Sequence, residues 1–361
     1  MRFSSLLLPA LAVLALSAHS LTAQTLLVYD DFAGTTIDAN KWLTFGPQTS
    51  VANSRLRFNM TAVNKEEIEG GVITFEGLSG DFDVVLDFDN FANTIATGGA
   101  LELFVEGAAN PMVSDPYVGV EIVSYQDSTN KIIRRFGSFM DDGTKEFEAK
   151  GPGITDTAGQ LRITRTATGI AVLARTSQQK GWTLMKTWPP FLPKLVRMGI
   201  NAFAGDSSTN NSGKLAVDCD KISLAAKRIA GPINYGKNCD GILTLAAGFP
   251  YVGNANFGYL LGGNSNLRGS ATVMVLGSNK LGLPIKIGNI TAPSCFLNTN
   301  PILILMGTIL DNDGEGAVGL PVPNDSSLLG VNVKVQHMIV RIAPSPRIAF
   351  TQGIETKIFK L

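Results

Sequence analysis

Apolar and polar residues alternate with a period of two along most of the chain. In the segment 82–88, Phe, Val and Leu alternate with Asp, and the segments 100–105, 118–125, 161–166 and 170–175 behave similarly. Because successive side chains of a strand point to opposite faces, this pattern predicts half-buried β-strands. No segment of ten or more residues combines a 3.6-residue apolar period with helix caps, so we expect an all-β protein.

Short polar turns separate the predicted strands. Asp141, Asp142 and Gly143 stand between the segments 132–136 and 145–148, and glycine there can adopt a positive φ without steric cost. A second turn, around Thr168 and Gly169, joins 161–166 to 170–175. Many strands at such short spacing are typical of antiparallel sandwiches or barrels.

The length of 361 residues suits two domains of ordinary size. A boundary falls near Lys227 to Pro232, where the composition changes. We therefore expect a first sandwich over residues 25–228 and a smaller second one over residues 234–361.

The first 23 residues have the pattern of a secretory signal peptide. Arg2 supplies the positive start, Leu6 to Leu16 form an apolar core, and Ala18 to Ala23 offer small residues for cleavage. Pro9, Ser17 and His19 interrupt the run, which argues against a membrane anchor. We expect export to the periplasm, the cell surface or the medium, with no membrane span in the mature chain.

The three cysteines fit an oxidising compartment. Cys239 and Cys295 both lie in Gly/Pro/Asn-rich turns of the second half, and we pair them as a disulfide. Cys219 lies in an alternating, strand-like run, so we expect it to be a buried free thiol.

Composition excludes two broad classes of protein. The chain has 30 basic and 30 acidic residues, so it has no net positive field to attract nucleic acid. Hydrophobic residues make up 45% and charged residues 17%, which argues against disorder.

Motifs in the first half resemble the concanavalin A-like lectin/glucanase superfamily, in particular its laminin-G-like bacterial jelly rolls. The resemblance spans roughly residues 28–225. The matching segments are Tyr29 to Asp38, Lys41-Trp42, Gly80 to Val84, Leu161 to Arg165, Gly181 to Leu184, Met198 to Ile200 and Ala216 to Asp218. It implies two facing antiparallel sheets, one of them often concave enough to hold a sugar chain. It also implies that Trp42 and Trp182 pack in the core.

The second half resembles a C-terminal β-sandwich module of exported proteins from planctomycete-like bacteria. The matching segments are Tyr235 to Cys239, Gly253 to Phe257, Gly282 to Ile285, Ala292 to Cys295, Leu320 to Asp325 and Leu328 to Gly330. That module carries a cysteine pair at the positions of Cys239 and Cys295, which supports the pairing above.

Catalytic chemistry has few candidates. His337 is the only histidine left after signal cleavage, so a Ser-His-Asp triad or a histidine-rich metal site would have to use it. We interpret it as a partly exposed structural residue. The glucanases of the superfamily use a Glu-x-Asp-x-x-Glu strand. Neither of the two nearest sets of acids, Asp83, Asp87 and Asp89 or Glu102 and Glu106, reproduces that pattern.

Glu121 is the sharpest candidate. The segment Tyr117 to Val123 resembles the Gly-x-Glu-x-Gln strand of a jelly-roll family that cleaves keto-sugar glycosides, although Val123 replaces the glutamine. A carboxylate there could abstract a proton or accept hydrogen bonds from sugar hydroxyls. Tyr117 and Tyr125 stand at even offsets from Glu121 and should share its face. Trp188 precedes two prolines, so we expect it in a loop, either as a sugar platform or as a cap on the sandwich.

The sequence gives little support for a calcium site. The acidic run Asp311 to Glu315 fails the spacing of a calcium loop and instead predicts a tight hairpin between 303–309 and 317–322. We therefore expect no cofactor, with a structural calcium ion elsewhere in the acid-rich first domain as the open alternative.

The leading hypothesis is an exported, non-catalytic protein that binds glycan or cell-envelope polysaccharide through Glu121, Tyr117, Tyr125 and Trp188. The alternatives are a structural or adhesive envelope protein and an enzyme on keto-sugars that uses Glu121.

Overall fold

The computed structural model describes residues 25–360 with short gaps at 40, 47, 64–66, 97, 108–115, 128, 130, 206–211, 230, 263, 287–290, 292–293 and 343–344. The signal peptide expected at residues 1–23 lies outside the described residues. Strands make up nearly all the regular structure, and the helical segments of the described part are two 3₁₀ turns, Ser265–Leu267 and Ser326–Leu328. No helix in this part is long and apolar enough to cross a membrane. The protein is all-β, as the alternating pattern predicts.

The first half forms a sandwich of two antiparallel sheets. The front sheet has the order β10-β9-β8-β7-β14-β5-β2, and the back sheet has the order β13-β12-β11-β6-β15-β4-β3, with β1 also paired to β15. The front strands are β2 (Trp42–Phe45), β5 (Ile68–Thr74), β7 (Gly99–Gly107), β8 (Tyr117–Gln126), β9 (Ile132–Asp141), β10 (Glu146–Ile154) and β14 (Leu195–Ala204). The back strands are β1 (Leu27–Asp30), β3 (Thr49–Val51), β4 (Leu56–Ala62), β6 (Gly77–Asn93), β11 (Gly159–Thr166), β12 (Gly169–Thr176), β13 (Thr183–Trp188) and β15 (Gly213–Ile229). The start of β6 also pairs with β14, which joins the two sheets at one corner.

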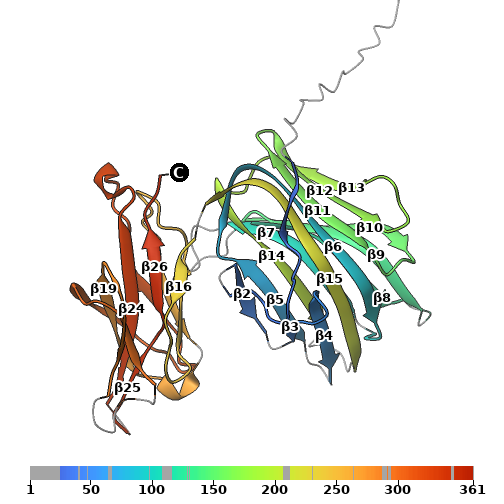
Figure 1. Cartoon of the computed structure of the whole chain (residues 1–361). Coiled ribbons are helices and arrows are strands. Elements are labelled where there is room, and N and C mark those ends of the chain that lie inside the picture. Colours follow the sequence, from blue (N-terminus) through green and yellow to red (C-terminus); the bar gives the residue numbers. More distant parts are fainter. Residues whose placement is uncertain are drawn as a thin grey trace, which may run out of the picture.

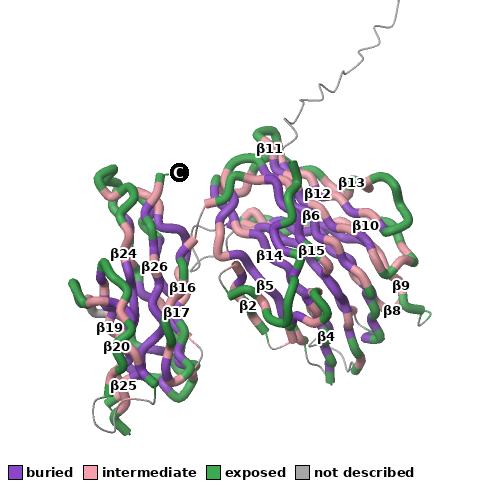
Figure 2. The backbone as a smooth tube through the Cα atoms, in the orientation of Figure 1, coloured by how far each residue is buried: buried purple, intermediate pink, exposed green. Residues whose placement is uncertain are grey.

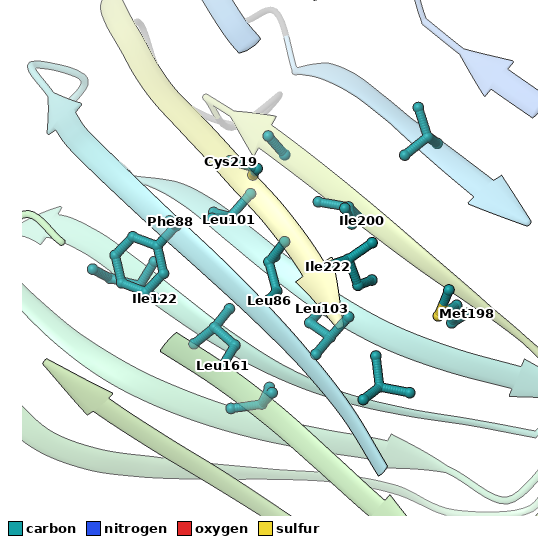
Figure 3. Close-up of a cluster of buried hydrophobic side chains, with 14 of the residues drawn as sticks. Leu86, Phe88, Leu101, Leu103, Ile122, Leu161, Met198, Ile200, Cys219 and Ile222 are labelled. Atoms are coloured by element: carbon teal, nitrogen blue, oxygen red, sulfur yellow. The ribbon is translucent and has the colours of Figure 1, made fainter. Parts of the chain in front are cut away.

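The core of this sandwich consists of every second side chain of the facing strands (Figure 3). From the front sheet it takes Leu101, Leu103, Ile122, Met198 and Ile200, and from the back sheet Leu86, Phe88, Leu161, Cys219 and Ile222. Each of these is at most 2% exposed. Burial of one such side chain stabilises the fold by about 1.5–3 kcal/mol, so the inner faces hold the two sheets together. Figure 2 shows the buried positions running along β6, β14 and β15.

The second half forms a smaller sandwich (Figure 1). Its main sheet has the order β16-β26-β24-β19-β22, with β25 paired to β24, and the smaller sheets are β17-β18-β23 and β20-β21. The strands are β16 (Ile233–Tyr235), β17 (Leu243–Ala247), β18 (Gly258–Gly262), β19 (Ala271–Gly277), β20 (Lys280–Pro284), β21 (Phe296–Thr299), β22 (Leu303–Ile309), β23 (Gly316–Gly319), β24 (Asn332–Arg341), β25 (Arg347–Phe350) and β26 (Gly353–Lys357). A separate apolar cluster that includes Phe257, Tyr259 and Ile339 forms its core.

Cys239 and Cys295 form the disulfide expected from the sequence, across a separation of 56 residues. Both are buried in the second core. Cys219 is a buried free thiol in the first core, as its alternating context indicates.

Two sequence-based expectations for the second half are wrong. The strands on either side of Asp311 to Glu315 do not form a hairpin, because β22 pairs with β19 while β23 pairs with β18. The turn itself is tight, since Asp311 Oδ1 accepts hydrogen bonds from the backbone N–H groups of Asp313 and Glu315. His337 is fully buried rather than partly exposed, and burial lowers its pKa to about 3.

The two sandwiches touch through an aromatic side chain of the second. Phe249 is fully buried and packs with Leu195 of β14, where Gly77 leaves room for the ring. The guanidinium carbon of Arg197 lies 4.9 Å from the centre of the Phe249 ring. Arg197 also donates weak 3.5 Å hydrogen bonds to the carbonyls of Ala246 and Gly248.

Candidate functional site

Four strands of the front sheet place one row of residues on the outer face of that sheet. This face points away from the back sheet. Asn201 of β14 is directly opposite Glu102 of β7, Glu102 is opposite Glu121 of β8, and Glu121 is opposite Gly137 of β9. Residues directly opposite in an antiparallel sheet project from the same face. The register therefore places two glutamates side by side.

Alternation along β8 fixes the direction in which Glu121 points. Val118, Val120 and Ile122 are fully buried in the core, so the residues between them face outward. Tyr117 and Tyr125 share that outer face with Glu121, as their even offsets predict.

A groove of about 630 Å³ opens beside the two glutamates. Its lining consists of aromatic or apolar side chains and four carboxyl groups: Glu102, Tyr117, Glu121, Val123, Phe139, Met140, Glu146, Phe147, Glu148 and Phe203. The structure thus brings Glu121 and Tyr117 together in one groove. Tyr125 lies outside this lining, and the guanidinium carbon of Arg135 lies 4.7 Å from the centre of its ring.

Glu102 and Glu121 are 9% and 8% exposed. Neither carboxyl group accepts a hydrogen bond from any other residue in the part of the chain that the structure describes. Burial, reinforced by the charge of Glu148 and opposed by Arg135, raises the pKa of Glu121 to about 7. Burial, reinforced by the charges of Glu121, Glu69 and Glu106, raises the pKa of Glu102 well above its ordinary value. At neutral pH the pair therefore holds protons that exposed glutamates would have released.

Glycines make room for the large side chains of the outer face. A Cβ at position 137 would meet the carboxyl end of Glu121, and a Cβ at position 119 would collide with the ring of Phe139. The ring of Phe139 thus lies across the backbone of β8. The Tyr117 ring packs beside it, with ring centres 5.4 Å apart. The floor of the groove consequently presents ring surface next to carboxyl groups.

Asn201 extends the polar row toward β5. Its Nδ2 donates a 2.8 Å hydrogen bond to Glu69, while its buried Oδ1 has no hydrogen-bond partner among the described residues. On the other side of the pair, Arg135 donates to the hydroxyl of Tyr125 at 3.3 Å and lies 3.8 Å from Glu148. This arginine is therefore engaged at the rim of the groove.

The structure places Trp188 elsewhere. It ends strand β13 of the back sheet instead of lying in a loop, and it is 6% exposed within the first core. Its ring packs edge-on against Phe147, with centres 6.2 Å apart. A side chain so buried presents no open face to a sugar, and Trp188 is not part of the groove lining.

The other two tryptophans behave differently from each other. Trp42 is buried, as the resemblance implies, and its indole N–H donates a 2.7 Å hydrogen bond to Asp30. Trp182 is not a core residue. It is partly exposed, and the guanidinium groups of Arg162 and Arg175 lie 5.2 Å and 4.6 Å from its ring centre.

Sequence reasoning missed three residues of this site: Glu102, Asn201 and Phe139. Glu102 was considered only as part of a glucanase motif along its own strand. Glu102 matters because it lies opposite Glu121 on the neighbouring strand. The residues around Glu102 in the sequence do not show which residue of the next strand lies opposite it. One feature of the sequence did point to Glu102. It is the only charged residue in the apolar segment 100–105, and such a position can indicate a functional side chain.

Metal-binding clusters of three or more His, Cys, Asp or Glu side chains are absent from the described residues. The carboxyl oxygens of Glu102 and Glu121 could still contribute to a cation site together with oxygens from a ligand.

Neither a known protein-family model nor a curated protein matches the sequence. Solved structures similar to part of the chain include lectins and glucanase-like proteins. An immunostimulatory antigen and pseudo β-1,3-glucanase of Mycobacterium tuberculosis shares 16% identity at a TM-score of 0.42, over 56% of this chain and 99% of its own. A legume lectin-like domain from Entamoeba histolytica shares 11% at 0.36, over 52% and 90%. Lectin I-B4 from Griffonia simplicifolia, in its metal-free form, shares 12% at 0.39, over 56% and 99%. At this level of similarity the neighbours establish neither a ligand nor an activity for this chain.

Proposed function

We propose that the protein is an exported, non-catalytic carbohydrate-binding protein whose ligand lies in the groove on the outer face of the front sheet. One observation carries the proposal. Glu102 and Glu121 are nine-tenths buried in the groove, and the described part of the protein supplies no donor to either. Both carboxyl groups line the open groove, so the hydroxyl groups of a ligand can donate hydrogen bonds to them.

The rest of the groove suits a sugar. Tyr117 and Phe139 offer ring surface against which the apolar face of a pyranose can pack. Sugar sites generally combine such rings with a few fixed polar groups. The disulfide in the second sandwich supports the proposed export, because such bonds persist mainly in oxidising compartments.

The proposal is tested by screening residues 25–361 on a glycan array and measuring affinity for the hits by calorimetry. We expect Glu121→Gln and Tyr117→Ala each to weaken binding at least tenfold. Glu315→Gln, the same change at an exposed site of the second sandwich, serves as the matched control. A blank array at high oligosaccharide concentration would instead favour a structural or adhesive envelope protein.

A second candidate function follows from the pKa of Glu121. A carboxyl group that titrates near neutral pH is suited to act as a general base, here on a proton beside the carbonyl of a keto-sugar. Turnover of keto-glycosides that disappears in Glu121→Gln would establish this activity. Binding without turnover leaves the lectin-like function in place.

A further inference from the structure

The charged side chains that line the groove are all acidic. Four glutamates line it, and its lining contains no lysine or arginine among the described residues. Glu69 of β5, Glu106 of β7 and Asp141 of β9 project from the same outer face. The basic groups on that face stand at its borders: Arg135 is engaged with Tyr125 and Glu148, Arg197 stacks on Phe249, and Lys150 is exposed on β10.

From this asymmetry we infer that the ligand is a cationic amino sugar whose free ammonium group sits between Glu102 and Glu121. The inference rests on the proposed carbohydrate-binding function and narrows it to one class of glycan. Both carboxyl groups of the pair are at least nine-tenths buried, open into the groove and lack a donor from the described residues, so they are available to a ligand.

An ammonium group matches the pair better than a hydroxyl group. A hydroxyl group donates one hydrogen bond and brings no charge that would favour release of the protons held by the pair. An ammonium group donates up to three hydrogen bonds and adds a positive charge, so one group can bridge both glutamates. Charge-assisted hydrogen bonds of this kind are about twice as strong as neutral ones.

The aromatic floor fits the same ligand. A ring carries negative potential on its face, which attracts a cation as well as the apolar face of a sugar. Tyr117 and Phe139 lie beside the carboxyl groups in the lining, so a polymer of amino sugars could place successive units on rings and carboxyls.

The test compares oligomers with the same backbone. Calorimetry at about pH 7, where an amino group is still largely charged and Glu121 is partly ionised, measures the affinity for a glucosamine oligomer, its N-acetylated counterpart and a glucose oligomer of equal length. We expect the glucosamine oligomer to bind at least tenfold more tightly than the other two, with an affinity that falls as salt is raised. Glu102→Gln and Glu121→Gln should abolish that preference, while Glu315→Gln should preserve it.

The outcomes separate the two proposals. Equal affinity for the charged and the acetylated oligomer overturns the amino-sugar inference and leaves carbohydrate binding intact. Binding of a neutral glycan that requires Ca²⁺ and is lost in a chelator also overturns it, because a divalent cation would then occupy the pair. If none of the oligomers binds and the glycan array is blank, both proposals fail. The comparison among ligands uses the unmodified protein, so it decides the matter even if a glutamine variant does not fold.

Discussion

The charged form of Glu121 destabilises the folded protein, because the side chain is buried. Its pKa rises from an ordinary 4.5 to about 7 because the folded state buries it without a donor. Between these two pKa values the folded chain binds more protons than the unfolded chain does. The free energy of unfolding therefore falls as pH rises through this window, and the full penalty is present above about pH 7.

Glutamine at position 121 removes the charge while keeping the shape. At about pH 8 we expect Glu121→Gln to be more stable than the unmodified protein by up to about 3 kcal/mol, because 2.5 pKa units correspond to that free energy. At about pH 4.5 the two should be nearly equally stable, since the glutamate is then protonated in the folded state. Denaturant unfolding at both pH values measures the difference, and a difference that does not change with pH contradicts the burial argument.

The sequence alone placed some of the candidate residues correctly and one of them wrongly. Glu121, Tyr117 and Tyr125 were identified from alternation and a short motif, and the structure places all three on one face. Trp188 was misplaced because two prolines after a tryptophan suggest a loop, whereas the prolines here only end β13. Tertiary pairing with β12 decides its burial, since Trp188 lies opposite Ile170.

At the scale of elements, pairs of glycine and aromatic residue shape the front sheet. Gly119 of β8 lies opposite Phe139 of β9 and also opposite Phe104 of β7, whose ring lies over Gly199 of β14. At both glycines the ring occupies the space that a Cβ would need. These pairs keep bulky side chains close to the sheet, which leaves the groove open above them.

Gly119→Ala tests this arrangement. The new Cβ would displace the Phe139 ring toward the groove, and we expect a loss of about 1–3 kcal/mol of stability together with weaker ligand binding. Thermal unfolding and calorimetry measure the two effects. Gly319→Ala on strand β23 is the matched control, because nothing lies within 4 Å of the Cβ it would add. Equal effects at the two positions would mean that the ring's position over Gly119 has no role.

Elements with local partners were predictable and elements with distant partners were not. The pairing of β9 with β10 and of β11 with β12 follows from short turns that sequence reveals. A turn of the same appearance between β22 and β23 misled the prediction because the two strands diverge into different sheets. Sheet membership depends on which partner completes each core, and no local pattern of residues contains that information.

At the scale of the molecule, each sandwich has its own apolar core, and the second also has a disulfide. In the chain-entropy account, closing a loop across 56 residues stabilises the fold by about 4 kcal/mol. We expect Cys239→Ala with Cys295→Ala to lower the melting temperature of the second sandwich and to leave that of the first unchanged. Differential scanning calorimetry measures both transitions. Cys219→Ala is the complementary variant, since it should affect only the first.

Phe249 couples the sandwiches. Truncation of a buried phenylalanine lowers the free energy of unfolding by about 3–5 kcal/mol. Here much of that loss would weaken the contact between the two sandwiches. We expect Phe249→Ala to broaden the distribution of interatomic distances in small-angle X-ray scattering while each sandwich stays folded. Leu243→Ala, at an exposed leucine of the second sandwich, should leave the scattering unchanged. An unaltered profile in Phe249→Ala would show that other contacts hold the sandwiches together.

The contact between the two sandwiches at Phe249 requires that residue 77 has no Cβ. A Cβ at that position would lie 2.7 Å from Cδ1 of Leu195 and 2.8 Å from the Phe249 ring, closer than non-bonded carbon atoms approach. One methyl group on β6 would therefore displace the Leu195 side chain, the Phe249 ring or both. A side chain at position 77 would therefore loosen the packing between the two sandwiches at this contact.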